Sequence, residues 1–193
     1  GYTGWLDWYL SSNLSNKKSL ETHLLPNLAI EGVPKKLKGT VYPFKYNDFG
    51  YLKKIIREKN IGVIKMEVVR NILPKNNFLK KVREIATKNN IVLIFDECTT
   101  GFRGTYGGLH KIFGINPDLA IFGKAIGNGY AINAIIGKKE IMNMANKSFI
   151  SSTFWTEKIG YIAALATINE MKKIRSWEKV NLIGKKVKKF WIN

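Results

Sequence analysis

Two apolar segments in the middle of the chain each lead into an ionisable residue. Residues 91–95 run directly into Asp96, and residues 119–122 are followed by Gly123 and Lys124. Short apolar runs rich in β-branched residues are typical of parallel strands that are buried on both faces. Ligands of open α/β sheets bind at the carboxyl ends of such strands. The pattern therefore predicts a largely dry site that contains Asp96 and Lys124.

The remaining periodicity predicts alternating helices and strands. Helices are expected in four segments, 5–10, 49–59, 78–89 and 157–173, and in 49–59 and 78–89 the apolar residues recur at helical spacing. Further strands are expected at 40–44, at 61–66 (which ends on Glu67) and at 132–136. This alternation is typical of an α/β domain with a mostly parallel sheet flanked by helices. Right-handed crossovers would bring the carboxyl ends of the parallel strands to one edge.

Composition narrows the class of protein. The chain has 193 residues, of which 45% are hydrophobic and 12% aromatic, which excludes a disordered protein and allows one substantial core. No apolar run has the length of a membrane span, and no signal peptide is recognisable. A single cysteine, Cys98, forms no internal disulfide and is typical of a reducing cytoplasm.

The net charge of +18 raises the hypothesis of a basic nucleic-acid-binding module. Only five of the 32 basic residues are arginine, the residue preferred for bidentate contacts to phosphates and bases. The lysines are scattered, and the densest run, 185–189, is expected to form a solvated helix face. Composition therefore favours a chain without a nucleic-acid partner, with the binding module as the alternative.

Four segments, in the same order, resemble class III aminotransferases that depend on pyridoxal 5'-phosphate (PLP). The central pair is IVLIFDECTTGFR and GINPDLAIFGKAIGNGY, and the outer pair is GYTGWLDW and ISSTFWTEKIG. Within the family, the chain most resembles the glutamate-1-semialdehyde 2,1-aminomutase-like branch. The resemblance implies transfer of an amino group by PLP, in an enzyme acting on a small amino or oxo compound. A sugar or polysaccharide-precursor aminotransferase is the alternative within the family.

The resemblance also implies a role for each matching residue. Lys124 would form the Schiff base and move the substrate proton, and Asp96 would hold the ring nitrogen protonated. Cys98 would pack against the ring, Tyr2 would lie over it, and Thr153 would reach the cofactor phosphate of a neighbouring subunit. Cofactor binding is thus expected from Lys124, Asp96, Cys98, Thr153 and Tyr2, with no metal.

Four of these residues also have an ordinary structural interpretation, and the alternative for Cys98 is a catalytic thiol, which only His23 or His110 could activate. Lys124 could be an exposed turn residue, Asp96 a helix cap, Thr153 a polar loop residue, and Tyr2 an aromatic core residue. Glu97, beside Asp96, could serve as a cap or as a supporting residue. The sequence departs from the family at Thr3, where histidine is usual, and at Val68, where the usual Glu-Pro-Val is Glu67-Val68-Val69.

The resemblance predicts an incomplete fold-type I large domain. Residues 1–193 are expected to be the partial PLP-binding part of a cytoplasmic homodimer, with both flanking parts of the family absent. The upstream phosphate loop and the C-terminal substrate-binding residues belong to those flanks. We therefore expect the chain alone to be inactive.

Overall fold

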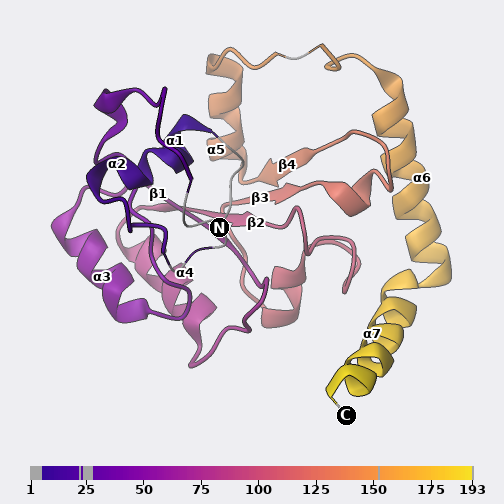
Figure 1. The fold of residues 1–193 in the computed structure, drawn as a ribbon. Coiled ribbons are helices and arrows are strands. Elements are labelled where there is room, and N and C mark those ends of the chain that lie inside the picture. Colours follow the sequence, from indigo (N-terminus) through magenta and orange to yellow (C-terminus); the bar gives the residue numbers. More distant parts are fainter. Residues whose placement is uncertain (1–5, 22, 24–27, 152, 193) are drawn as a thin grey trace.

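The protein is a four-stranded sheet with helices, seen in a computed structural model that describes residues 6–21, 23, 28–151 and 153–192. The strands are β1 (Val63–Glu67), β2 (Val92–Asp96), β3 (Leu119–Phe122) and β4 (Ala134–Gly137), in the spatial order β1-β2-β3-β4. The first three are parallel, and β4 is antiparallel to β3. Figure 1 shows the sheet crossing the centre of the molecule.

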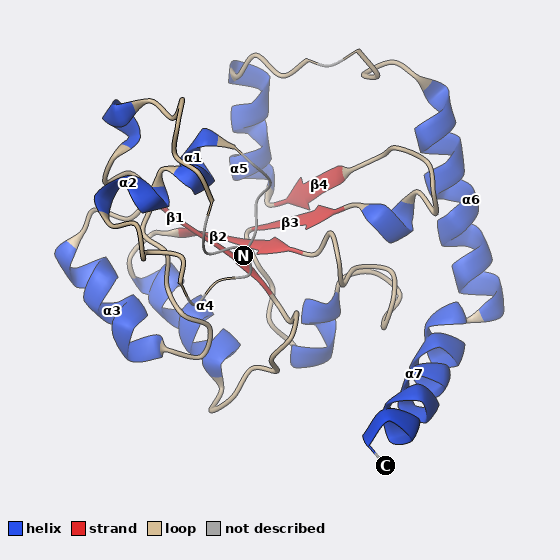
Figure 2. Cartoon of the chain, viewed as in Figure 1, coloured by secondary structure: helices blue, strands red, loops and turns tan. Residues whose placement is uncertain are grey.

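Seven α-helices are assigned among the described residues. They are α1 (Asp7–Leu10), α2 (Ser12–Ser15), α3 (Phe49–Glu58), α4 (Phe78–Lys88), α5 (Lys139–Met142), α6 (Lys158–Ile174) and α7 (Ser176–Ile192). Four 3₁₀ turns accompany them: η1 (Lys35–Leu37), η2 (Leu109–Phe113), η3 (Lys124–Ile126) and η4 (Asn143–Lys147). The predicted α/β architecture with a mostly parallel sheet is confirmed (Figure 2).

One face of the sheet carries the core. Successive strand residues point to opposite faces, and the strand residues on this face, such as Met66, Leu93 and Phe95, are buried. Helices α3 and α4 cover β1 and β2 through Leu52, Val82 and their neighbours. Helix α6 covers β3 in a second cluster that joins Ala120, Phe122, Ile126 and Ala164. Helices α3 and α4 are amphipathic, as the periodicity predicts, whereas α6 also exposes the apolar residues Ile159, Ile162 and Leu165.

The opposite face is only partly covered within the described chain. Its residues alternate with the core residues along β1, β2 and β3 and are half-buried, apart from Val63, which is exposed. The prediction of strands buried on both faces is therefore wrong for this chain. The apolar residues at nearly every position of β2 and β3 underlie that prediction, but the described helices α3, α4 and α6 pack on one face only.

Two predicted strands differ from the structure. Residues 40–44 form no strand; Pro43 in this segment has no N–H to donate to a sheet ladder, and Phe44 instead packs against the core beside α3. The strand expected at 132–136 lies at Ala134–Gly137 and runs antiparallel. The helices at 49–59, 78–89 and 157–173 are confirmed to within one residue at each end.

Asp118 fixes the start of β3. Its buried carboxylate accepts hydrogen bonds from the Leu93 N–H and from Arg83, both at 2.8 Å, and pairs with Lys138 at 2.7 Å. These partners come from β2, from α4 and from the turn after β4. The Asp118 carboxylate thus links three elements to the amino end of β3. These links fix the position of β3 and, with it, the position of Lys124 after the carboxyl end of the strand.

Within the described residues, no helix is both long and apolar enough to cross a lipid bilayer.

Shortening Leu93 to alanine should lower the free energy of unfolding by about 2–5 kcal/mol, because the cavity would open in the fully buried centre of the core. Urea denaturation followed by circular dichroism measures the loss. Leu165→Ala is the matched control, since Leu165 is exposed on α6; it should change the free energy by no more than about 0.5 kcal/mol. Equal losses in the two variants would contradict the one-sided core.

Candidate active site

The carboxyl ends of β2 and β3 bring Asp96 and Lys124 to the same edge of the sheet. Asp96 is the last residue of β2, where it pairs with Ile121 of β3. Lys124 follows β3 by two residues, at the start of η3. Its Nζ donates a hydrogen bond of 2.8 Å to the Thr99 hydroxyl, so the amine lies against the turn that follows Asp96. The predicted meeting of these two strand ends is confirmed.

Lys124 has an unusual backbone conformation. Its φ of 48° lies in the left-handed region, which costs a residue with a side chain about 1–2 kcal/mol. The turn that holds it is tight, because a Cβ on Gly127 would stand 2.2 Å from the Tyr130 carbonyl oxygen. Strained residues of this kind gather at functional sites. The geometry therefore supports a chemical use of the amine.

Lys124 is exposed in the described chain. The largely dry surroundings predicted for it are therefore wrong here. The reason is the half-open sheet face: the described helices cover the core side of the strands and leave this edge open to water.

Asp96 is an ionised, half-buried carboxylate. Its Oδ2 accepts a hydrogen bond of 2.7 Å from the Lys65 ammonium of β1, and its Oδ1 accepts one of 3.1 Å from the Cys98 N–H. Burial alone would raise the pKa of Asp96, but the hydrogen bond and charge of Lys65, with the Cys98 N–H, outweigh it and hold the pKa below its ordinary value. The carboxylate is thus ready to accept a further cationic donor.

Glu97 points to the other side of β2 and is completely buried. Its oxygens accept hydrogen bonds from the Leu109 N–H (3.0 Å), the His110 N–H (2.9 Å) and the Thr100 hydroxyl, and one lies 2.8 Å from His110 Nδ1. Burial opposes ionisation, but these bonds outweigh it and hold the pKa of Glu97 below its ordinary value of 4.5. Glu97 therefore anchors the turn that carries Cys98 and Thr99. This is a supporting role, which the sequence predicts as one alternative beside a helix cap.

Cys98 and Glu67 complete this edge. Burial and the neighbouring Asp96 raise the pKa of the Cys98 thiol above its ordinary value, so the thiol stays protonated and suits packing better than nucleophilic attack.

Glu67 ends β1 at the same edge. Burial raises the pKa of its carboxyl group, although the positive charge of Arg70, 3.1 Å away, acts to lower it. Val68, which replaces the family's proline, is fully buried, and its carbonyl accepts a hydrogen bond from the Tyr46 hydroxyl.

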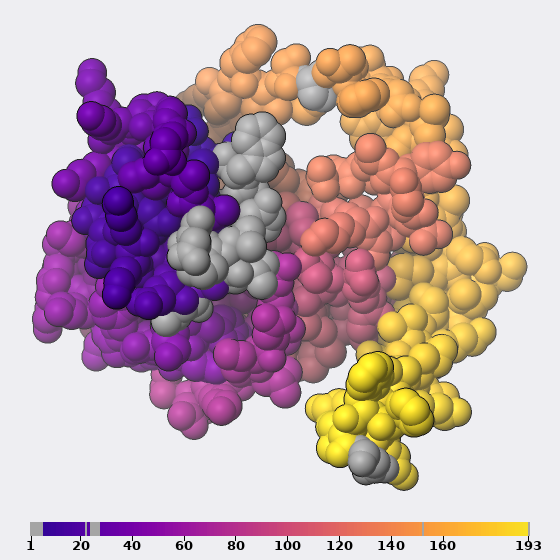
Figure 3. Space-filling model, in the orientation of Figure 1, coloured from indigo at the N-terminus to yellow at the C-terminus, as the bar shows by residue number. Residues whose placement is uncertain are grey.

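One predicted site residue, Thr153, is not brought to this edge. Thr153 is exposed in the loop between η4 and α6, which arches beyond the β4 edge of the sheet in Figure 1. The space-filling view shows an opening between this arch and the strands (Figure 3). Tyr2 and Thr3 lie outside the described residues.

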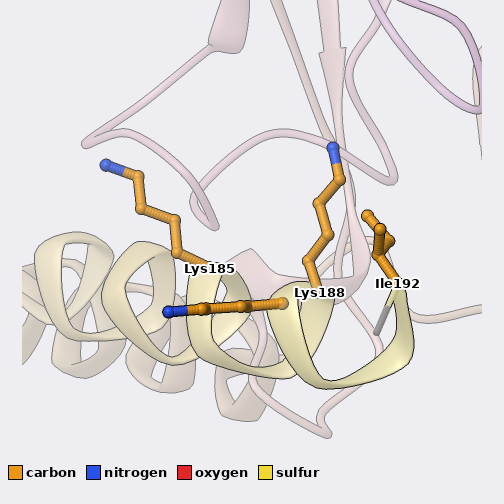
Figure 4. A pocket seen from close by; sticks show the side chains of 4 residues that line it. Lys185, Lys188 and Ile192 are labelled. Atoms are coloured by element: carbon orange, nitrogen blue, oxygen red, sulfur yellow. The ribbon is translucent and has the colours of Figure 1, made fainter.

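The lysine run at 185–189 lies on α7, far along the sequence from the strand ends. Its side chains are exposed, as expected for a solvated helix face. A shallow hollow on this helix is lined by Lys185, Lys188, Lys189 and Ile192, and Figure 4 shows Lys185 and Lys188 extending from the same side of the helix. These residues are separate from the Asp96 and Lys124 site.

The chain matches one family model over most of its length. The family model of Aminotransferase class-III matches residues 69–190, a span that contains Asp96, Lys124 and Thr153. The chain belongs to the class-III aminotransferase family.

Curated relatives agree with this family. The chain is 37% identical over 195 residues to 3-aminobutyryl-CoA aminotransferase of Cloacimonas acidaminovorans, covering 96% of this chain and 43% of that protein. It is 41% identical over 157 residues to glutamate-1-semialdehyde 2,1-aminomutase of Sulfolobus acidocaldarius, covering 78% of this chain and 37% of the relative. The chain thus spans less than half the length of these class-III relatives.

Solved structures have the same fold. An omega-transaminase from Sphaerobacter thermophilus superposes with a TM-score of 0.73 at 25% identity, over 88% of this chain and 42% of that one. The PLP internal aldimine form of FumI from Sphingopyxis sp. MTA144 gives a TM-score of 0.70 at 22% identity, over 84% and 43%. The expected fold, part of the fold-type I architecture of PLP transaminases, is confirmed.

Sequence reasoning missed two residues at this edge of the sheet. Thr99 receives the Lys124 hydrogen bond, and its position three residues after Asp96 in the Cys-Thr-Thr-Gly turn was the available signal. Lys65 pairs with Asp96 from the middle of β1. A lysine inside an otherwise apolar strand was the signal for that pair, because a charge in such a place needs a partner.

Replacing Glu97 by glutamine should lower the free energy of unfolding at neutral pH by about 1–3 kcal/mol, because the new amide would point a donor at existing donors. The depressed pKa of Glu97 stabilises the folded chain above pH 4.5, its ordinary value, and this stabilisation is lost as the pH falls through the folded value. The difference between the two chains should therefore shrink below pH 4.5.

Urea denaturation from pH 7 to pH 3 measures this difference. Glu170→Gln is the control, since Glu170 is exposed and its partner Lys173 is 3.9 Å away. A constant gap between wild type and Glu97→Gln at every pH would contradict an ionised Glu97 in the folded chain.

Proposed function

We propose that the chain is the PLP-binding part of an enzyme that transfers amino groups, with Lys124 as the covalent anchor of the cofactor. The observation that carries the proposal is the hydrogen bond from Lys124 Nζ to Thr99, which sets an amine beside the turn of an ionised Asp96. Membership of the class-III family supports it, as do the PLP-containing transaminase structures with the same fold.

The described residues fit two parts of the cofactor. The aldehyde of PLP bonds to an amine, and Lys124 offers one at an exposed position. The protonated ring nitrogen of PLP is stabilised by a carboxylate, and Asp96 offers one in ionised form. Thr153 is the proposed phosphate ligand, on the arch that stands apart from these two residues. PLP, when bound, supplies a ring that stabilises negative charge on the substrate's α-carbon.

The roles of the protein's own groups follow from their contacts. Lys124 would hold the cofactor and then carry a proton to and from the substrate. The Thr99 hydroxyl orients the Lys124 amine, and Asp96 would accept the ring N–H. Cys98, a protonated thiol next to Asp96, would pack against the ring. Glu97 would keep this turn in place from the buried side of the sheet.

The substrates would be small amino and oxo compounds, as the transaminase family suggests. The relatives act, by their names, as a 3-aminobutyryl-CoA aminotransferase and as glutamate-1-semialdehyde 2,1-aminomutases. We propose amino-group transfer as the activity that these names share. A reducing cytoplasm is the proposed location, because the sole cysteine, Cys98, is a free thiol.

We further propose that two copies of the chain share each site. The arch that carries Thr153 exposes large apolar side chains at Phe149, Ile150, Phe154 and Trp155, and Phe149 is 100% exposed. Exposed apolar groups gathered in one segment are typical of a protein interface. An arch held off its own sheet can reach another subunit, where Thr153 would meet the cofactor phosphate.

Replacing Lys124 by alanine should abolish the covalent trapping of PLP at residue 124. Stoichiometric PLP is added to each chain, borohydride reduces the lysine–cofactor bond, and peptide mapping locates the adduct. Wild type should carry the adduct mainly on Lys124, because the exposed lysines elsewhere have no such site around them. Lys139→Ala, in exposed helix α5, is the control and should leave the adduct on Lys124. An even spread of adducts in wild type would refute the role of Lys124.

The shared site predicts complementation between two defective chains. Lys124→Ala lacks the amine and Thr153→Ala lacks the phosphate ligand, so a heterodimer of the two restores one intact site from Lys124 of one chain and Thr153 of the other. PLP binding by the mixture should exceed the mean of the separate chains, as measured by spectral titration. No gain in PLP binding on mixing would argue against a shared site.

The same interface predicts an effect on the oligomeric state. Sedimentation should show Trp155→Asp shifted toward monomer, with Ile112→Asp, at another exposed position, unchanged.

A further inference from the structure

Lys65 contacts the carboxylate that the proposed function gives to the cofactor. In the strand register, Lys65 of β1 pairs with Ile94, and Glu67 pairs with Asp96. Lys65, Glu67 and Asp96 therefore share the half-open face of the sheet. The ammonium of Lys65 reaches Asp96 Oδ2 at 2.7 Å, and the two side chains are only 29% and 14% exposed.

We propose that Lys65 is a positioning residue that fixes Asp96 and shares its carboxylate with the protonated ring nitrogen of the bound cofactor. The inference rests on the proposed function, because the second cation is the one that PLP would bring. It adds a residue that sets how firmly that nitrogen keeps its proton.

The hydrogen-bonding capacity of Asp96 permits such sharing. An ionised carboxylate has about four acceptor positions on its two oxygens. Lys65 uses one on Oδ2, and the Cys98 N–H uses one on Oδ1. A third donor can therefore bind without displacing Lys65. The two contacts also fix the orientation of the carboxylate plane. The protonated ring nitrogen would therefore donate to an acceptor that is already held in place.

The charges around Asp96 set the sign of the effect. Glu67 of β1 contributes a carboxyl group that Arg70 engages, Cys98 is a protonated thiol, and Lys124 follows β3. Lys65 is the cation in direct contact with Asp96. It partly cancels the negative charge that the ring nitrogen would face, because like charges repel across the shared carboxylate. The ring nitrogen should thus lose its proton more readily than it would beside an unshared aspartate.

The first test needs no cofactor. Carbon-13 NMR follows the Asp96 carboxyl through a pH titration in wild type, Lys65→Met and Lys65→Arg. Removing the ammonium should move the midpoint upward in Lys65→Met, whereas Lys65→Arg keeps the charge and should stay near wild type. Lys138→Met is the matched control, because Lys138 pairs with Asp118 at the same distance of 2.7 Å; it should leave the Asp96 midpoint unmoved. An unchanged midpoint in Lys65→Met overturns the proposal.

The second test uses PLP labelled with nitrogen-15 in the ring. With saturating cofactor, the ring nitrogen of Lys65→Met should keep its proton to a higher pH than that of wild type or Lys65→Arg. Identical ring titrations in all three chains overturn the sharing of the carboxylate. Absence of PLP binding in wild type would overturn the proposed function and the sharing together. The cofactor-free titration would still decide whether Lys65 fixes Asp96, so the two failures are distinguishable.

Discussion

The buried carboxylate of Glu97 constrains the geometry of the whole site. A charge with no exposure to water is tolerated only where donors surround it, and the donors here come from Thr100, Leu109 and His110. Together, these hydrogen bonds fix the path of the chain from the end of β2 to η2. Asp96, Cys98 and Thr99 lie on that path, so the position of the Thr99 hydroxyl, which accepts the Lys124 hydrogen bond, depends on a neighbouring residue whose side chain is bonded to the opposite side.

The sheet adds a second constraint, because consecutive strand residues point to opposite faces. Asp96 and Glu97 are neighbours in sequence, yet one meets Lys65 on the half-open face and the other is enclosed beneath the sheet. This alternation separates a structural carboxylate from one that is available for chemistry. It also explains why the two acids, identical in charge, have such different surroundings.

Much of this arrangement is predictable from the sequence because it depends on local pattern. The apolar runs before Asp96 and Lys124 predict both strands and the edge where they meet, and the amphipathic helices α3 and α4 follow from their periodicity. The strand expected at 40–44 is absent, and Pro43, which cannot donate to a ladder, was the signal in the sequence against it. The exposure of Lys124 was unpredictable, because burial depends on which segments cover a face, and no local pattern encodes that. The pairing of Lys65 with Asp96 joins residues 31 apart and needs the strand register to be known.

The left-handed backbone of Lys124 separates two selective pressures at one position. Glycine would occupy this conformation without steric cost, so folding alone would favour a residue that has no amine. The chain instead retains a long cationic side chain where it lowers stability. In the role proposed for Lys124, this loss of stability would be the cost of placing an amine at the site, a trade-off common at catalytic residues.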